Sequence, residues 1–160
     1  MKENLAQVAV SLDIAGRRSL FVLLSEDGSI NRMGTGSPAS PDNDLYIGAG
    51  QSALFTSFLE RVPEEIFAFQ GRYEVRERTG AECELAILFG TRANETVGFE
   101  FRYGAESEGP PREICDLVRA AVDVTDHWYR EQQAMTGDGR QNGAGPQATS
   151  QTRNEMPKRR

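Results

Sequence analysis

One glycine-rich turn has the residue types and spacing to bind a phosphate. Gly48, Gly50 and Ser52 stand in the run Gly-Ala-Gly-Gln-Ser-Ala, which fits the G-x-G-x-x-G/A pattern of dinucleotide-binding turns. In such a turn a pyrophosphate lies on the free backbone amides at the start of a helix. However, the apolar run before the turn, residues 45–47, is short, and no clear parallel β-α-β unit follows it. A close-packed turn from strand to helix is therefore the favoured interpretation, and nucleotide or phosphate binding is an alternative.

The other side chains that could do chemistry are scattered along the chain. His127 is the single histidine and stands in polar sequence at the end of a predicted helix, so we interpret it as a solvated helix residue. Cys83 and Cys115 belong to different predicted elements, and one histidine with two distant cysteines argues against a zinc site. Asp42 and Asp44 could bind a cation, but they lack the spacing of an EF-hand and are interpreted as solvated loop acids. We expect no catalytic residue, no metal site and no cofactor.

Charge and composition limit the class of partner. The chain has 160 residues and a net charge of −6, and residues 137–160 hold five basic and two acidic residues, so the rest carries −9. An acidic body argues against a nucleic-acid groove. No apolar run approaches the length of a membrane span, and the N-terminus does not follow the pattern of a signal peptide. We therefore expect a cytoplasmic protein with reduced cysteines, bound to neither nucleic acid nor membrane.

Hydrophobic periodicity predicts the elements that position these residues. It predicts strands over residues 8–14, 20–24, 30–35, 83–89 and 97–103, and helices over residues 52–62 and 111–133. Ser52 is a candidate cap for the first helix. Residues 20–24 and 83–89 are apolar on both faces, which is typical of strands covered on both sides.

Hairpins followed by helices predict an α+β fold, with one or more antiparallel sheets packed against two to three helices. We expect one domain over residues 1–135 and a disordered polar tail over residues 136–160. Residues 64–78 are ambiguous: Pro63 and the acidic residues after it favour a helix, while the alternation from Tyr73 to Glu77 favours a strand. The helix is the preferred prediction.

A longer segment resembles a known family. The resemblance rests on an apolar strand, a hairpin ending in Asp-Gly, the run Asn43–Ser52 and the amphipathic helix after it, and more loosely on residues 76–81 before the next strand. These features resemble the C-terminal half of proteasome β-type subunits and of the peptidase subunits of bacterial ATP-dependent proteases, which share the N-terminal-nucleophile (Ntn) hydrolase fold. The resemblance spans residues 8 to about 103. It implies partial proteasome-like layers, with two sheets between helices, assembly into rings and a threonine nucleophile.

The sequence departs from that family where the chemistry lies. The half that carries the nucleophile is absent, and Met1 is followed by Lys-Glu-Asn without a site that would expose a threonine. The family's supporting serine falls on Ala49, and its supporting acid on Arg76, or on Glu77 after a slip of one residue. The resemblance therefore implies a subunit or remnant that needs a second chain for catalysis.

The absence of a recognisable catalytic set favours a binding function over an enzymatic one. The phenylalanines are most simply core residues, but eight of them in a small acidic body could instead leave an apolar surface for a partner. The preferred hypothesis is a non-catalytic protein-binding or self-assembling domain, acting through an exposed face or an open sheet edge, with a homo-oligomer as the expected state.

Overall fold

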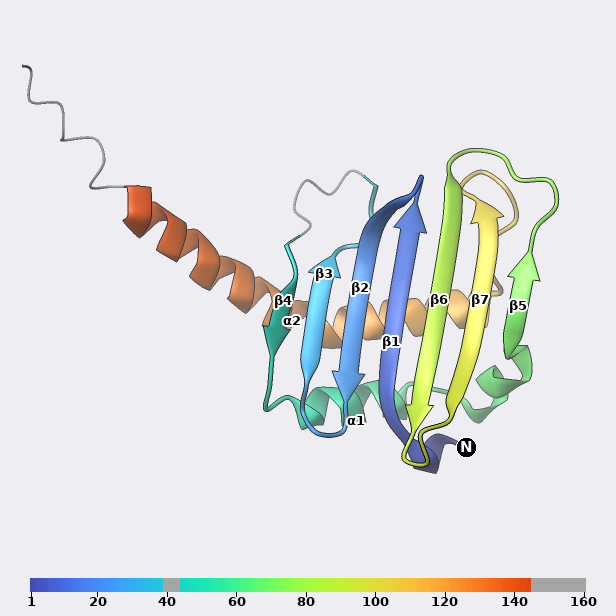
Figure 1. The fold of residues 1–160 in the computed structure, drawn as a ribbon, viewed down its shortest axis with the longest axis horizontal. Helices are drawn as coiled ribbons and strands as arrows, with labels where there is room; N and C mark the ends of the chain where they lie inside the picture. The colour runs from blue at the N-terminus through green and yellow to red at the C-terminus, as the bar shows by residue number, and fades with distance from the viewer. Residues whose placement is uncertain (39–43, 145–160) are drawn as a thin grey trace, which may run out of the picture. The chain divides into compact units, whose positions relative to one another are not determined.

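The computed structural model describes residues 1–38 and 44–144, and residues 39–43 and 145–160 lie outside that description (Figure 1). The chain divides into two compact units, residues 1–127 and residues 128–160, and each is considered by itself. The domain boundary expected after residue 135 stays a prediction.

The described elements confirm the α+β class. The strands are β1 (Leu5–Ile14), β2 (Arg17–Ser25), β3 (Ile30–Gly34), β4 (Tyr46–Gly48), β5 (Gly71–Glu74), β6 (Glu82–Thr91) and β7 (Thr96–Gly104). The helices are α1 (Ser52–Glu60) and α2 (Arg112–Ala144), with short 3-10 helices η1 (Lys2–Asn4) and η2 (Glu64–Phe69). Helix α2 thus continues beyond Gln133, where its predicted range ended, and enters the segment predicted as a tail.

The strands form one seven-stranded sheet in the order β4-β3-β2-β1-β6-β7-β5 (Figure 1). The pairings are antiparallel except that of β5 with β7, which is parallel, so the sheet is mixed rather than purely antiparallel. Both edge strands are short, with three residues in β4 and four in β5. Short edges are a common protection against pairing with another sheet.

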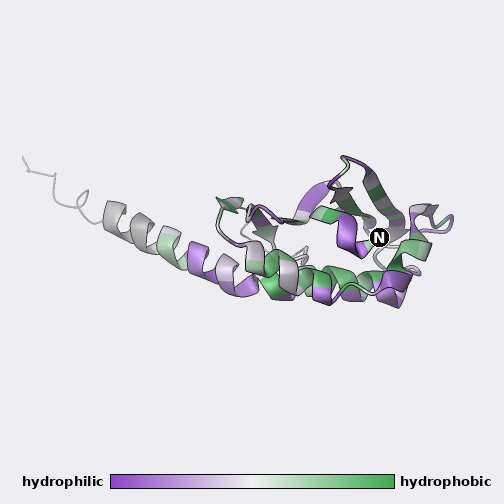
Figure 2. Cartoon of the chain, turned by 90° about the horizontal axis from the view of Figure 1, so that it is seen from below, coloured by the Kyte–Doolittle hydropathy of each residue, from purple (hydrophilic) through white to green (hydrophobic). Residues whose placement is uncertain are grey.

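The hydrophobic core lies between one face of the sheet and the helices (Figures 1 and 2). Alternate residues of the long strands are fully buried on this covered face, among them Val8, Val10, Val22, Leu24, Ile87, Phe89 and Phe99. Phe55 and Phe58 of α1 and the stripe Ile114, Leu117 and Ala121 of α2 are buried as well. The period of two in the strands and of about 3.6 in the helices explains why these residues share one core.

The prediction of one helix over residues 64–78 is wrong in its second half. Residues 64–69 form the 3-10 helix η2, and the next residues form β5 instead of a second helical turn. Gly71 has a φ of 141°, which a helix does not accept. Tyr73 stacks on Phe101 with ring centroids 5.0 Å apart, so packing against β7 stabilises the strand.

The start of α1 also differs from the expected cap. Gln51 is the N-cap residue and makes no side-chain cap hydrogen bond, while Ser52 is the first residue of the helix. Ser52 therefore does not serve as the cap that the sequence suggested.

Candidate functional site: the open face of the sheet

The Gly48–Ser52 turn packs against the hairpin between β2 and β3. The backbone N–H of Gln51 donates to the carbonyl of Gly28 at 3.0 Å. A Cβ on Gly28 would lie 3.1 Å from the backbone nitrogens of Gly50 and Gln51, so the two turns approach closely. Gly50 has a φ of +75°, which favours glycine, and Ser52 is exposed. A close-packed turn explains these glycines, and phosphate binding by Gly48, Gly50 and Ser52 remains a prediction.

Two of the reactive residues approach a common neighbour, because Cys83 and Cys115 both raise the pKa of the Tyr103 hydroxyl. His127 is exposed on α2, Cys83 is buried in β6 and Cys115 is half-buried on α2, and both cysteines are free. Asp44 is exposed, and Asp42 lies outside the described residues. Among residues 1–38 and 44–144, no group of histidine, cysteine and carboxylate side chains could hold a metal ion.

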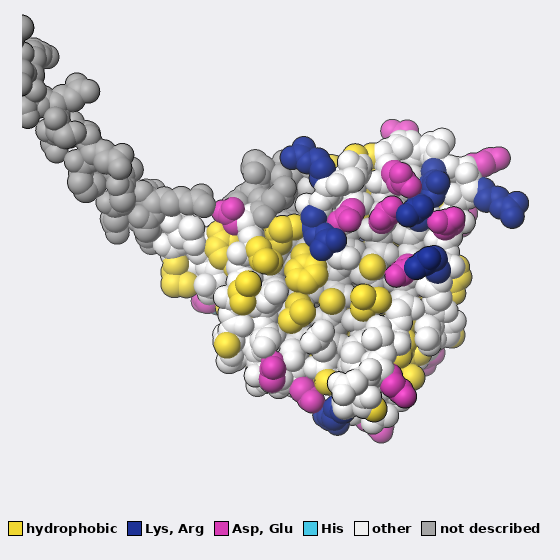
Figure 3. Space-filling model, in the orientation of Figure 1, with side chains coloured by type: hydrophobic (Ala, Val, Ile, Leu, Met, Phe, Trp, Pro, Cys, Tyr) yellow, Lys and Arg dark blue, Asp and Glu magenta, His cyan; other side chains and the backbone are white. Residues whose placement is uncertain are grey.

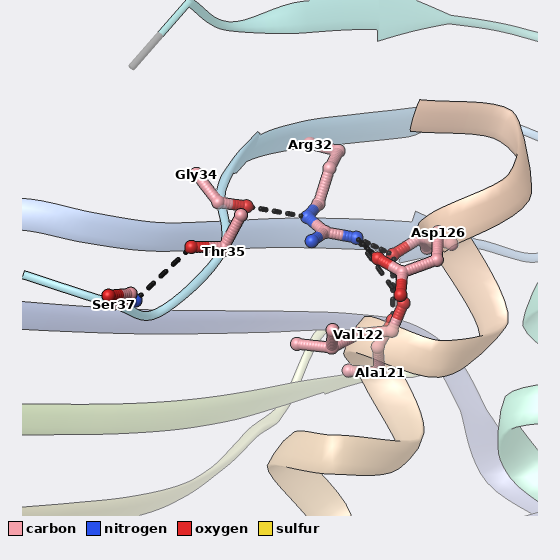
Figure 4. A network of polar contacts seen from close by, with 8 residues as sticks. Arg32, Gly34, Thr35, Ser37, Ala121, Val122 and Asp126 are labelled. Carbon is pink, nitrogen blue, oxygen red and sulfur yellow. Dashed lines mark hydrogen bonds and ion pairs between the residues drawn. The ribbon is translucent and has the colours of Figure 1, made fainter. Parts of the chain in front are cut away.

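A buried arginine that the sequence analysis missed holds α2 to the sheet (Figure 4). Arg32 of β3 is 1% exposed, and its Nε donates to the carbonyl of Gly34 at 3.0 Å. Its Nη1 lies 2.9 Å from both the Thr125 hydroxyl and the Asp126 carboxylate, and 3.3 Å from the Val122 carbonyl. These contacts join β3 to α2, so Arg32 positions the helix against the sheet. In β3, Arg32 falls on the same alternating face as Ile30 and Gly34. That alternation was the sequence signal for a buried charge.

Tyr103 of β7 has a strongly raised pKa. Burial raises the pKa of its hydroxyl to about 12, and Cys83, its neighbour across the β6–β7 pair, adds to the shift. Burial also raises the pKa of the Cys83 thiol. Both groups are therefore held in their neutral forms, which suits a structural role and not an activated nucleophile.

The opposite face of the sheet is left open by the described part of residues 1–127 (Figure 3). Its middle carries apolar side chains from β4, β3, β2, β1 and β6. We refer to this set as the apolar strip: Ala9, Phe21, Leu23, Met33, Ile47, Ala86 and Leu88. Ile47 is 70% exposed and Leu88 is 38% exposed, although both lie in β-strands.

The pairing register shows how the strip is built. Ala9 of β1 pairs with Leu23 on one side and Leu88 on the other. Two residues further along β1, Ser11 lies between Phe21 and Ala86. These rows bring apolar side chains of three strands side by side, with the small polar Ser11 between Phe21 and Ala86.

Charged side chains occupy one end of the open face. They surround a shallow hollow of about 360 Å³, which Asp13, Arg18, Arg72, Glu84, Glu100 and Arg102 help to line. Arg18 pairs with Asp13 at 2.8 Å, Arg72 with Glu100 at 2.6 Å, and Arg102 with Glu84 at 2.9 Å. Because these groups already compensate one another, the hollow presents a mixed, nearly neutral surface.

Comparisons with known proteins add no relative: no family model, no curated protein and no solved structure matches this chain. The relationship to proteasome subunits therefore stays a prediction, and the described residues form one sheet where that family has two. No helix among the described residues is long and apolar enough to cross a membrane.

The open face corrects one expectation from the sequence. Residues 20–24 and 83–89 are apolar on both sides and were expected to be covered on both. The described residues 1–127 cover only one side, which leaves Phe21, Leu23 and Leu88 at the surface. The double-sided pattern was the signal for this site, although a pattern alone does not say what covers the second side.

Proposed function

We propose that this protein is a protein-binding module whose docking surface is the open face of the sheet. The observation that supports it is the mismatch on β2 and β6, whose composition suits burial on both faces while one face is open. Exposed apolar side chains that form a continuous patch are typical of interaction surfaces.

The dimensions of the open face suit a protein partner. Strands β2, β1, β6 and β7 have nine or ten residues each. At about 4.8 Å between strands and about 3.3 Å per residue, they span roughly 600 Å². This area approaches the ~800 Å² per partner of a standard interface. Apolar side chains in the middle and charged side chains at one end also resemble the apolar centre and polar rim of such surfaces.

Site-specific photo-crosslinking in the cells that make the protein tests this function. A photoreactive phenylalanine derivative replaces Phe21, which lies in the apolar strip, and in a second variant it replaces Ser57, an exposed residue of α1. We expect protein adducts from position 21, identified by mass spectrometry, and none from position 57. Adding Leu88→Glu to the position 21 variant should remove the adducts. If position 21 gives no protein adduct, the open face is not a docking surface in those cells.

A further inference from the structure

We infer that the occupant of the open face is a second copy of this chain, packed sheet on sheet about a two-fold axis that runs along β1. This inference rests on the proposed function, because it names the partner of the same surface. It follows from the register of β2 and β6 around β1, from the charges on the face and from the shape of the sheet edges.

Three successive rows of side chains cross the open face, each made of one β1 residue and its partners on β2 and β6. Each row is complementary to the same row of a second copy. In the first, Ala9 lies between Leu23 and Leu88, and in the second, Ser11 lies between Phe21 and Ala86. A two-fold axis along β1 exchanges the two sides of each row. It places leucine over leucine in the first row and a large ring over a small methyl in the second, so the two faces can interlock.

The third row supplies opposite charges. Asp13 lies between Arg18 and Glu84. The same rotation places Arg18 of one copy over Glu84 of the other, twice in each dimer. Asp13 meets its own equivalent near the axis, and its existing ion pair with Arg18 at 2.8 Å offsets that repulsion.

A two-fold axis across the strands does not fit the same rows. Rotation about an axis through Ser11, perpendicular to β1, places the row of Ala9 over the row of Asp13. It would press Leu88 against Glu84 and Leu23 against Arg18, and so bury charges without partners. The composition of the rows therefore selects the axis along β1, which also agrees with the near-parallel strands of aligned sheet packing.

The charge of the face permits two acidic molecules to meet there. Residues 1–136 carry a net charge of −9. The lining of the hollow carries three arginines and four carboxylates, a net −1. Like-charged bodies associate through their least charged surface, since repulsion is smallest there. The short edge strands β4 and β5 offer little backbone for the alternative, which is a continuous sheet through two edges.

A charge-exchange experiment on the purified full chain tests the arrangement. Arg18→Glu and Glu84→Arg each place like charges over one another at both contacts of a homodimer. We expect each variant alone to raise the dimer dissociation constant at least about tenfold, measured by light scattering and sedimentation. Mixing the two variants pairs opposite charges at both contacts, so a heterodimer should form with affinity close to that of the wild type.

Matched controls separate this result from general charge effects. Arg112→Glu and Glu108→Arg change the same charges at exposed positions away from the apolar strip and should leave the dimer unchanged. Damage to the fold by Arg18→Glu, which also breaks the pair with Asp13, is not repaired by mixing, so recovery in the mixture is specific to the contact.

The outcomes distinguish this inference from the proposed function. A monomeric wild type, or a dimer that both variants leave intact, overturns the homodimer. If Phe21 adducts in cells nevertheless contain a different protein, the docking function stands while the second copy does not. Adducts of two copies of this chain, with recovery in the mixture, support both.

Discussion

Phe89 and Leu88 are neighbours on β6, yet they lie on opposite faces of the sheet and differ completely in burial. Phe89 is fully buried, with ring centroids 5.6 Å from Phe67 and 6.0 Å from Phe99. Leu88 is 38% exposed. The contrast holds for the sheet as a whole, because the covered face supplies the core and the open face is available for binding. Substitutions on the covered face should therefore affect unfolding, and those on the open face should affect association.

The largest effect is expected from Phe89→Ala. Removing a fully buried ring from the aromatic cluster should lower the free energy of unfolding by about 3–5 kcal/mol, because the core cannot close the cavity. Urea unfolding followed by circular dichroism measures it, with Phe89→Leu as the control that retains most of the volume. A loss below about 1 kcal/mol would contradict the placement of this ring in the core.

Arg32→Met should have the next largest effect. It leaves the Asp126 carboxylate and the Thr125 hydroxyl without their buried partner, and we expect a loss of about 3 kcal/mol, since Asp126 remains 34% exposed. Adding Asp126→Leu should restore part of that loss, because the carboxylate that faced Arg32 is then removed as well.

The matched control for Arg32 lies on the open face. Arg102 makes ion pairs with Glu74, Glu82 and Glu84 but is 44% exposed. Arg102→Met should change the free energy of unfolding by less than about 1 kcal/mol, because solvent screens these pairs. Equal losses of unfolding free energy in Arg32→Met and Arg102→Met would show that the buried arginine contributes no more to stability than the exposed one.

Tyr103, on the covered face of the sheet, makes the stability of the folded state sensitive to alkaline pH. In the unfolded chain a tyrosine ionises near pH 10, whereas the folded pKa of Tyr103 is about 12. The folded state thus binds the proton more tightly, so the contribution of Tyr103 is fully present below pH 10 and is lost as the pH rises towards 12. Tyr103→Phe should flatten the fall in stability over that range, followed by urea unfolding at several pH values. An unchanged slope would contradict the raised pKa.

The sequence predicted more of the fold than of the site. The alternation in residues 8–14 and the helical spacing from Ile114 to Trp128 depend on local periods that a chain shows by itself, so their elements were correctly placed. Strand β5 was the less favoured alternative to a helix because its stability comes from Tyr73 on Phe101, a contact between residues distant in sequence. Arg32 was missed because its side-chain partners Thr125 and Asp126 lie 93 and 94 residues away in the sequence. The glycine turn was recognisable in the sequence as a motif. The open face was not, because the sequence does not say which side of β2 the helices cover.

The smallest effect on folding is expected from Leu88→Ala, and it gives the sharpest contrast with Phe89→Ala. Leu88 is partly exposed and leans over Gly98, so its truncation should change the unfolding free energy of the monomer by less than about 1 kcal/mol. Folding coupled to dimer formation makes the thermal midpoint rise with protein concentration. The wild type should show that rise, and Leu88→Ala should weaken it, while Met135→Ala, which truncates an exposed side chain of α2, should retain it. A concentration dependence that Leu88→Ala leaves intact would place the contact between copies elsewhere than on the open face.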